Sequence, residues 1–429
     1  MREARGRGGP PGTHVALLLL ALAAGAQEAK PLTRAGVLAE ATKVAAMIPS
    51  TDARAVVTAD IALELRKDDP AKGEALLAEA AFAATTEPYN FERALALQAV
   101  ARRVQTVDPQ WAADMLLEAT KLVEEIEFSN QRSLVLMQIG TAKAAANAED
   151  ARGLLEEAVV QARDIQEPQA RVAALRDLSA AFAAVDEATA QALFDEAMQA
   201  AEGLPPGAER DLSLADLAGF ITQRSVQQAV QLIDTIAEPA AKSQALHEAV
   251  LAFPLSEAEP ARELARSIPD EFTRIGTLAD LALRVAETSP ETARRAAEEA
   301  GTLAAALADP DMRNESQAAA AAAWAGLDAD RALADAGRIA DTYFADVARS
   351  RIALYLVPRA PQRALEIARS IERGVLQAEP LAALVPQLAA TDPAQAYALA
   401  SEIRTRRAWA EALLAVATRL RVASPGEAP

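Results

Sequence analysis

A fixed repeat length constrains the fold of this chain more than any other feature of its sequence. Equivalent positions recur after either 39 or 32 residues along almost the whole chain. The anchor positions of the series are Arg54, Arg93, Arg132, Arg171, Arg210, Lys242, Arg274, Arg313, Ala345, Gln377 and Trp409. The two steps differ by about two helical turns, so a helix can be lengthened while its buried face nearly keeps its register. The repeat therefore predicts stacked copies of one helical unit.

Each unit begins with a helix, which we call helix A. Apolar or small residues follow the anchor at offsets of 4, 7, 8 and 11 residues; in the second copy they are Leu97, Val100, Ala101 and Val104. This spacing is typical of one face of an α-helix. The composition agrees, because 51% of the residues are hydrophobic but only 4% are aromatic, and runs of strand-favouring residues are absent.

A second helix, helix B, is predicted to begin at offset 16. Asp69-Pro70, Asp108-Pro109 and Asp392-Pro393 each combine an N-cap residue with proline at the first helical position. Offset 19 is alanine in nine of ten complete copies and Gly73 in the first, so helix B can approach helix A closely. At offset 26 the 39-residue copies have alanine and the 32-residue copies have isoleucine, which places the length difference in helix B.

The sequence thus predicts an all-α chain of about ten A/B hairpins. A B-type helix from about Thr33 to Ile48 precedes them and a closing helix A reaches Leu420, which makes about 22 helices. We expect them to form one continuous α-solenoid superhelix over residues 27–422, without an internal domain boundary. Residues 423–429 are predicted to be a disordered tail.

This pattern resembles the tetratricopeptide-repeat family over nearly the whole chain. The shared features are the apolar pair and small residue of helix A, the small residue early in helix B, the central alanine of the long copies and the prolines near helix starts. The period differs from the usual 34 residues of that family, and HEAT-like solenoids are the alternative resemblance. Both imply a long curved surface that binds a protein or an extended peptide.

The tetratricopeptide resemblance also implies which residues line a binding groove. In that family the groove is lined by helix A residues that do not face the hairpin core, which correspond here to offsets 5, 9 and 12. The candidate partner-binding residues are Gln98, Arg102, Gln105, Met137, Thr141, Arg176, His247 and Leu251. They vary between copies, as a specific groove requires. The alternative is that they are solvated or pack against a neighbouring helix A, and that His247 is an ordinary surface residue.

Residue content excludes several kinds of catalytic site. The chain has no cysteine, which excludes disulfides, thiolate nucleophiles and cysteine zinc sites. One histidine, His247, follows the predicted signal peptide, so a protomer cannot assemble a Ser-His-Asp triad or a histidine metal site. We therefore predict no catalytic residues, no metal and no cofactor. Abundant carboxylates keep one alternative, an exported carbohydrate- or peptidoglycan-active enzyme that uses groove carboxylates.

A series of glutamates accompanies the basic anchors. Glutamate recurs at offset 25 of the long copies, as Glu79, Glu118, Glu157, Glu196 and Glu299. We expect the anchors and these glutamates to form a ladder of contacts between neighbouring helices, because such strict periodicity is what packing requires. The alternative is that the arginines bind an anionic partner.

The N-terminus is typical of a Sec-type signal peptide. Three arginines precede an apolar run, and Ala24-Gly25-Ala26 fits a cleavage site after Ala26. Residues 1–26 are then removed; a retained signal anchor is the alternative. Their net charge is +2, from three arginines and Glu3, so the formal −18 of the whole chain becomes −20. Such a surface repels nucleic acid and anionic lipid.

Together these features predict a non-catalytic scaffold or adaptor in the periplasm or outside the cell. Its partner is expected to be another envelope or secreted protein, or a peptide, bound through the solenoid surface. No further apolar run follows the signal, so no membrane-spanning segment is expected in the mature chain.

Overall fold

The computed structural model describes residues 32–144 and 148–420. The predicted signal peptide and the predicted disordered tail lie outside these residues. The described part contains 22 α-helices, two 3-10 helices and no strand. The predicted all-α fold of helical hairpins is confirmed.

Eleven helices are of type A and eleven of type B, and consecutive helices pack as hairpins. The A helices are α3 (Thr51–Leu65), α5 (Asn90–Val104), α7 (Ser129–Ala144), α9 (Pro168–Phe182), α11 (Ala208–Thr222), α13 (Pro239–Ala252), α15 (Glu271–Val285), α17 (Pro310–Ala322), α19 (Thr342–Leu356), α21 (Gly374–Ala389) and α23 (Arg406–Arg419). The B helices are α2 (Arg34–Ala45), α4 (Pro70–Thr85), α6 (Pro109–Leu122), α8 (Ala148–Arg163), α10 (Glu187–Glu202), α12 (Val226–Ile233), α14 (Ala258–Arg266), α16 (Pro290–Ala306), α18 (Ala329–Ala336), α20 (Pro361–Arg369) and α22 (Pro393–Ala400). The 3-10 helices are η1 (Val123–Glu125) and η2 (Leu255–Glu257).

The two repeat lengths differ where the sequence places the difference. Helix B has 14 to 17 residues in the long copies, as in α6 and α16, but only 8 or 9 in the short copies, as in α12 and α14. The alanines at offset 19 are all buried, which lets the two helices of a hairpin approach closely.

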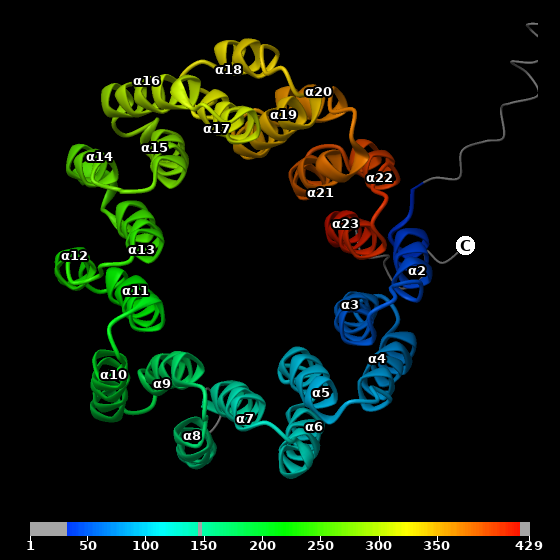
Figure 1. The fold of residues 1–429 in the computed structure, drawn as a ribbon. Coiled ribbons are helices and arrows are strands. Elements are labelled where there is room, and N and C mark those ends of the chain that lie inside the picture. Colours follow the sequence, from blue (N-terminus) through cyan, green and yellow to red (C-terminus); the bar gives the residue numbers. More distant parts are fainter. Residues whose placement is uncertain (1–31, 145–147, 421–429) are drawn as a thin grey trace, which may run out of the picture.

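The array of hairpins closes on itself as a ring (Figure 1). The first helix, α2, packs against the last, α23, and α23 also packs against α3. Helix α2 is of type B and α23 of type A, so together they complete an eleventh hairpin. The A helices form the inner layer of the ring and the B helices the outer layer (Figure 1). Closure was not predicted from the sequence, and it removes both exposed ends of the solenoid.

A buried arginine joins three helices at this seam. Arg34 of α2 is 5% exposed, and its guanidinium contacts the carboxylates of Glu64 (2.7 Å) and Asp68 (2.6 Å), at the end of α3. It also donates a hydrogen bond to the backbone carbonyl of Ala417 in α23. Burial disfavours the charged form of Glu64, but hydrogen bonds from Arg34 and Lys67 outweigh it and lower its pKa. This pairing therefore stabilises the seam above about pH 4.5 and is lost as the pH falls.

A hydrogen bond from Tyr397 makes the stability of the seam decrease at alkaline pH as well. Its hydroxyl donates a hydrogen bond to Glu40 of α2, and that bond, with burial, raises the pKa of Tyr397 from 10.0 to about 12. Because the folded pKa is the higher one, the stabilisation is complete below pH 10 and is lost as the pH rises through about 12. We expect alkaline absorbance titration to show one tyrosine near pH 12 that is missing in Tyr397→Phe. A Glu40→Gln variant that leaves this titration unchanged would contradict the assignment.

The basic anchors have partners other than the predicted glutamates. Five anchor arginines donate hydrogen bonds to the carbonyl six residues earlier, in the turn that directly follows the preceding helix B. They are Arg54, Arg93, Arg171, Arg274 and Arg313. Backbone carbonyls in such a turn have no partner within a helix, and a guanidinium offers several donors to satisfy them. A repeated contact to the turn after helix B thus takes the place of the predicted ladder of anchor-to-glutamate contacts, although, beside the hydrogen bond from Arg163, the charge of Arg171 still helps to lower the pKa of Glu196.

Replacing one anchor is expected to destabilise its own repeat. Arg93 donates to the carbonyl of Glu87 at 2.7 Å, so Arg93→Met should lower the free energy of unfolding by about 1 kcal/mol. Urea denaturation measures the change. In a double-mutant cycle, the effects of Arg93→Met and Glu118→Gln on the free energy of unfolding should be additive, because Glu118 pairs with Lys121. A measurable coupling energy between the two substitutions would instead support the predicted ladder.

In some copies a buried polar residue at offset 1 connects one hairpin to the next. Asp211 of α11 accepts hydrogen bonds from the backbone nitrogens of Ala237 (3.0 Å) and Glu238 (2.7 Å), just before α13. Ser243 of α13 accepts one from Asp270 (3.0 Å), just before α15. These contacts satisfy backbone donors in the turns and fix the angle between neighbouring repeats.

Between residues 32 and 420, outside the gap at 145–147, no helix is both long and apolar enough to cross a bilayer.

Candidate binding surface inside the ring

One stripe of each A helix is left uncovered by the packing. Neighbouring A helices cover its two flanks and helix B covers its back, so the remaining stripe faces the interior of the ring (Figure 1). In α5 the residues that are not fully buried include Leu95, Ala99 and Arg102, at offsets 2, 6 and 9. The 100° step of a helix places these offsets on one side. Offset 9 was among the predicted positions, whereas offsets 2 and 6 were missed.

Offset 6 carries a row of acids along the inner surface. The acidic residues at this offset are Asp60, Asp177, Asp216, Glu248 and Asp280. The recurrence of these acids is a sequence signal for the inward stripe, whereas the groove positions implied by the tetratricopeptide resemblance begin at offset 5. Four of them follow one another on α9, α11, α13 and α15, which makes that arc of the inner surface acidic.

Ion pairs link neighbouring A helices across this surface. Arg103 of α5 contacts Asp60 of α3 at 2.7 Å, and Arg176 of α9 contacts Asp216 of α11. Arg351 of α19 reaches Asp280 of α15 at 2.9 Å, past the intervening α17. The alanine-rich α17 has only short side chains there, so its two neighbours can bridge over it.

A cavity of about 420 Å³ lies between α5 and α7. Its lining residues are Gln98, Arg102, Gln105, Met137, Gln138, Thr141 and Ala142. All lie on the two A helices or, for Gln105, directly after α5, and none comes from α6, so the cavity belongs to the inner side of the ring. It brings together five of the eight predicted partner-binding residues. That these residues bind a partner stays a prediction.

The cavity presents hydrogen-bond donors that the fold does not use. Arg102 is exposed, and within the described ranges no ion pair or hydrogen bond occupies its guanidinium. Gln98 is buried and donates only a long hydrogen bond, 3.5 Å, to the carbonyl of Gln138. Thr141, by contrast, is satisfied by the carbonyl of Met137 at 2.8 Å. The site can therefore donate to carbonyl or carboxylate oxygens of an extended chain.

The other three predicted residues lie elsewhere on the inner layer. Arg176 already contacts Asp177 and Asp216. His247 lies 2.9 Å from the Thr277 hydroxyl, measured from its Nδ1 atom. That hydroxyl donates to the carbonyl of Thr273, so Nδ1 of His247 must be the donor to Thr277. Leu251 is half-buried on α13. None of the three lines the α5–α7 cavity.

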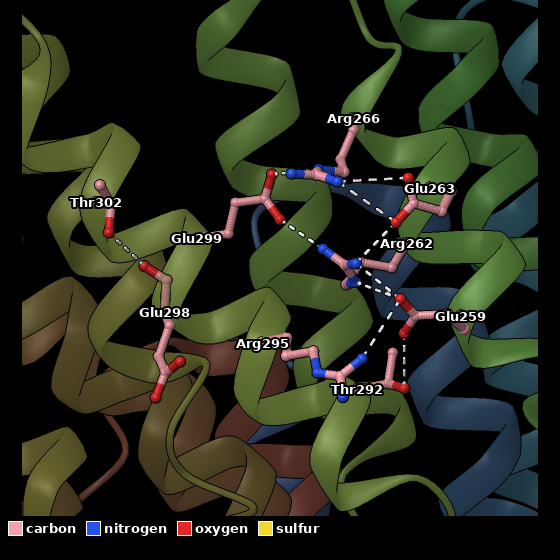
Figure 2. Close-up of polar contacts among 9 residues, drawn as sticks. All are labelled: Glu259, Arg262, Glu263, Arg266, Thr292, Arg295, Glu298, Glu299 and Thr302. Atoms are coloured by element: carbon pink, nitrogen blue, oxygen red, sulfur yellow. Dashed lines mark hydrogen bonds and ion pairs between the residues drawn. The ribbon is translucent and has the colours of Figure 1, made fainter.

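The most connected charged cluster lies on the outer layer instead (Figure 2). Arg262 of α14 is buried between Glu259, Glu263 and Glu299 at 2.7–2.8 Å, and Arg266 shares Glu299. Glu299, which was predicted to pair with an anchor, thus holds α16 to the preceding helix B. The Arg262 hydrogen bond lowers the pKa of Glu259 despite its partial burial.

The carboxyl groups with displaced pKa values all shift toward the ionised form. In the part of the chain that the structure describes, each carboxyl group with a displaced pKa has it displaced downward: Asp52, Glu64, Asp69, Asp186, Glu196 and Glu259. A glycoside-cleaving general acid needs the opposite direction. The same residues contain no group of three or more possible ligands for a metal ion.

Comparison with known proteins identifies no family. No family model matches the chain, and no curated protein matches it. Among solved structures, Ton1535 from Thermococcus onnurineus NA1 aligns with a TM-score of 0.36 and 16% identity, over 75% of this chain and 99% of that one. This likeness is too weak to carry an argument, and the tetratricopeptide or HEAT family name stays a prediction.

Proposed function

We propose that this chain is a non-catalytic exported scaffold that holds a protein segment or an extended peptide against the inner surface of its ring. The α5–α7 cavity carries the proposal, because Arg102, Gln98 and Gln105 offer donors that the fold leaves largely unused. Extended chains present such carbonyl acceptors along their length.

The size of the ring supports a partner that enters it. Eleven A helices at the usual interaxial distance of about 8–10 Å place their axes on a circle roughly 28–35 Å across. Side chains reach about 5–6 Å from each axis, which leaves an opening roughly 16–25 Å wide. An α-helix with its side chains is about 10–12 Å thick, so the opening accommodates one helix or an extended segment.

Site-specific photocrosslinking tests the proposal. A crosslinking residue at Gln105, in the cavity, should capture a partner when the protein is in its native envelope. The matched control places it at Glu74 of α4, whose side chain is 63% exposed on the outer layer. Capture from Glu74 but not from Gln105 would move the binding surface to the outside. Turnover of glycans or peptidoglycan by residues 27–429 would favour the enzymatic alternative.

Export is tested by the N-terminus of the protein recovered from cells. A chain that begins at Gln27 and is released with the periplasm or the medium supports the proposed location. A chain that retains residues 1–26 in the membrane fraction would establish the signal-anchor alternative.

A further inference from the structure

Most A helices begin with a side chain that caps the helix. At offset −4 from the anchor, the side chain accepts hydrogen bonds from backbone N–H groups of the first turn, which lack partners inside the helix. The capping residues are Ser50, Glu167, Glu238, Asp270, Asp309 and Asp341. The repeat therefore favours a polar residue at this position.

Two neighbouring repeats place an aromatic residue there instead. Tyr89 precedes α5 and makes no capping hydrogen bond, and Phe128, which precedes α7, has no group that could make one. Both are solvent-exposed, Tyr89 by 69% and Phe128 by 57%. These positions give up a cap and leave more than half of an aromatic residue exposed, so neither capping nor burial in the core accounts for them. Departures from a local rule of this kind concentrate at functional sites.

The two aromatic residues line one surface hollow of about 320 Å³ at the edge of the ring. The same hollow is lined by Phe91 and by Glu92, Glu125 and Glu127. We call the surface formed by these six residues the aromatic edge. It is separate from the α5–α7 cavity, with which it shares no lining residue.

The aromatic edge carries negative charge that nearby arginines do not neutralise. The anchors Arg93 and Arg132 donate to the backbone carbonyls of Glu87 and Glu127. Glu125 accepts a hydrogen bond from Asn90 at 2.9 Å. In the described part of the chain, no ion pair reaches the carboxylates of Glu92 or Glu127. Exposed rings beside unpaired carboxylates attract cations through both charge and the ring face.

We propose that the aromatic edge binds a basic, partly apolar segment of a partner protein. Arginine or lysine side chains would meet the glutamates and stack on Tyr89 and Phe128, while apolar side chains cover Phe91. Tyrosine and arginine are the residue types that dominate binding energy at protein interfaces. This surface adds a second contact to the ring, outside its inner cavity.

Serine substitutions separate binding from folding. Serine is a good N-cap, so Tyr89→Ser with Phe128→Ser should raise the melting temperature while weakening binding by about tenfold or more. The probe is a short fluorescent peptide that alternates arginine with leucine, measured by anisotropy. Phe82→Ser is the matched control, because Phe82 is also 69% exposed but lies on α4; it should leave binding unchanged.

Charge and sequence specificity complete the test. Glu92→Gln with Glu127→Gln should weaken binding of the arginine-leucine peptide and reduce its salt dependence. A glutamate-leucine peptide should not bind. The proposal is overturned if the acidic peptide binds equally well, if the serine variants bind unchanged, or if those variants lose stability, which would make the aromatic rings structural.

Discussion

Replacing Arg34 with methionine is expected to loosen the seam of the ring by about 3–5 kcal/mol. The guanidinium is buried and contacts Glu64, Asp68 and the carbonyl of Ala417 at once. Methionine has a similar apolar length but no donors, so two carboxylates and one carbonyl lose their partner in a place where water reaches poorly. Removal of one member of a buried charged group is among the most destabilising substitutions known for ion pairs.

The destabilisation should affect the helices at the seam before it affects the whole ring. In a solenoid each repeat contacts only its neighbours, so weakening the α2–α23 contact creates two free ends and leaves the far side of the ring intact. We expect amide hydrogens in α2 and α23 to exchange about 100-fold faster or more, because each 1.4 kcal/mol is a factor of ten. The protection of α11 and α13 should stay unchanged.

A neighbouring arginine provides the control for this substitution. Arg66 also lies near the end of α3, but its side chain is 33% exposed and its contact with Glu74 is longer, at 3.6 Å. Arg66→Met should therefore change stability by less than about 1 kcal/mol. Equal effects of the two variants, or uniform acceleration of exchange around the ring, would show that Arg34 does not hold the seam.

The hairpins could be predicted because their causes are local. Proline at the start of helix B, alanine at offset 19 and the alternation of alanine with isoleucine at offset 26 each act within one copy. Ring closure is different, since it depends on small rotations between repeats that add up over eleven hairpins. One clue was present in the sequence. A B-type helix from about Thr33 precedes the ten predicted hairpins and a helix A up to Leu420 follows them, and these two helices are the halves of one more hairpin.

The candidate binding surface was predicted only in part, for a geometric reason. Offsets 5 and 12 point toward the neighbouring A helix, so Gln98 is buried while Arg102, at offset 9, is exposed. The acids at offset 6 lie nearer the middle of the inward stripe. The hydrogen-bond partners of the anchors could not be predicted, because every residue has a backbone carbonyl and the acceptor therefore leaves no pattern in the sequence. Periodic glutamates such as Glu118 do form a pattern, which is why they were predicted as partners.

A pair of glycine substitutions tests how tightly the hairpins are packed. Gly73 occupies offset 19 in the first copy, where other copies have alanine, and a Cβ there would lie 2.6 Å from backbone atoms of Arg66. A backbone contact that short forces α3 and α4 apart. We therefore expect Gly73→Ala to lower the free energy of unfolding by about 1–3 kcal/mol, although alanine favours a helix.

Gly301 is the matched site where the same change should have the opposite sign. It lies inside α16, and a Cβ there would meet no atom within 4 Å. Gly301→Ala should raise stability by about 0.5–1 kcal/mol, because alanine restricts the unfolded chain and favours the helix. Urea denaturation of both variants gives the comparison. If both substitutions stabilise the protein, the first hairpin has room for a methyl group, and its glycine is not required by the close approach of α4 to α3.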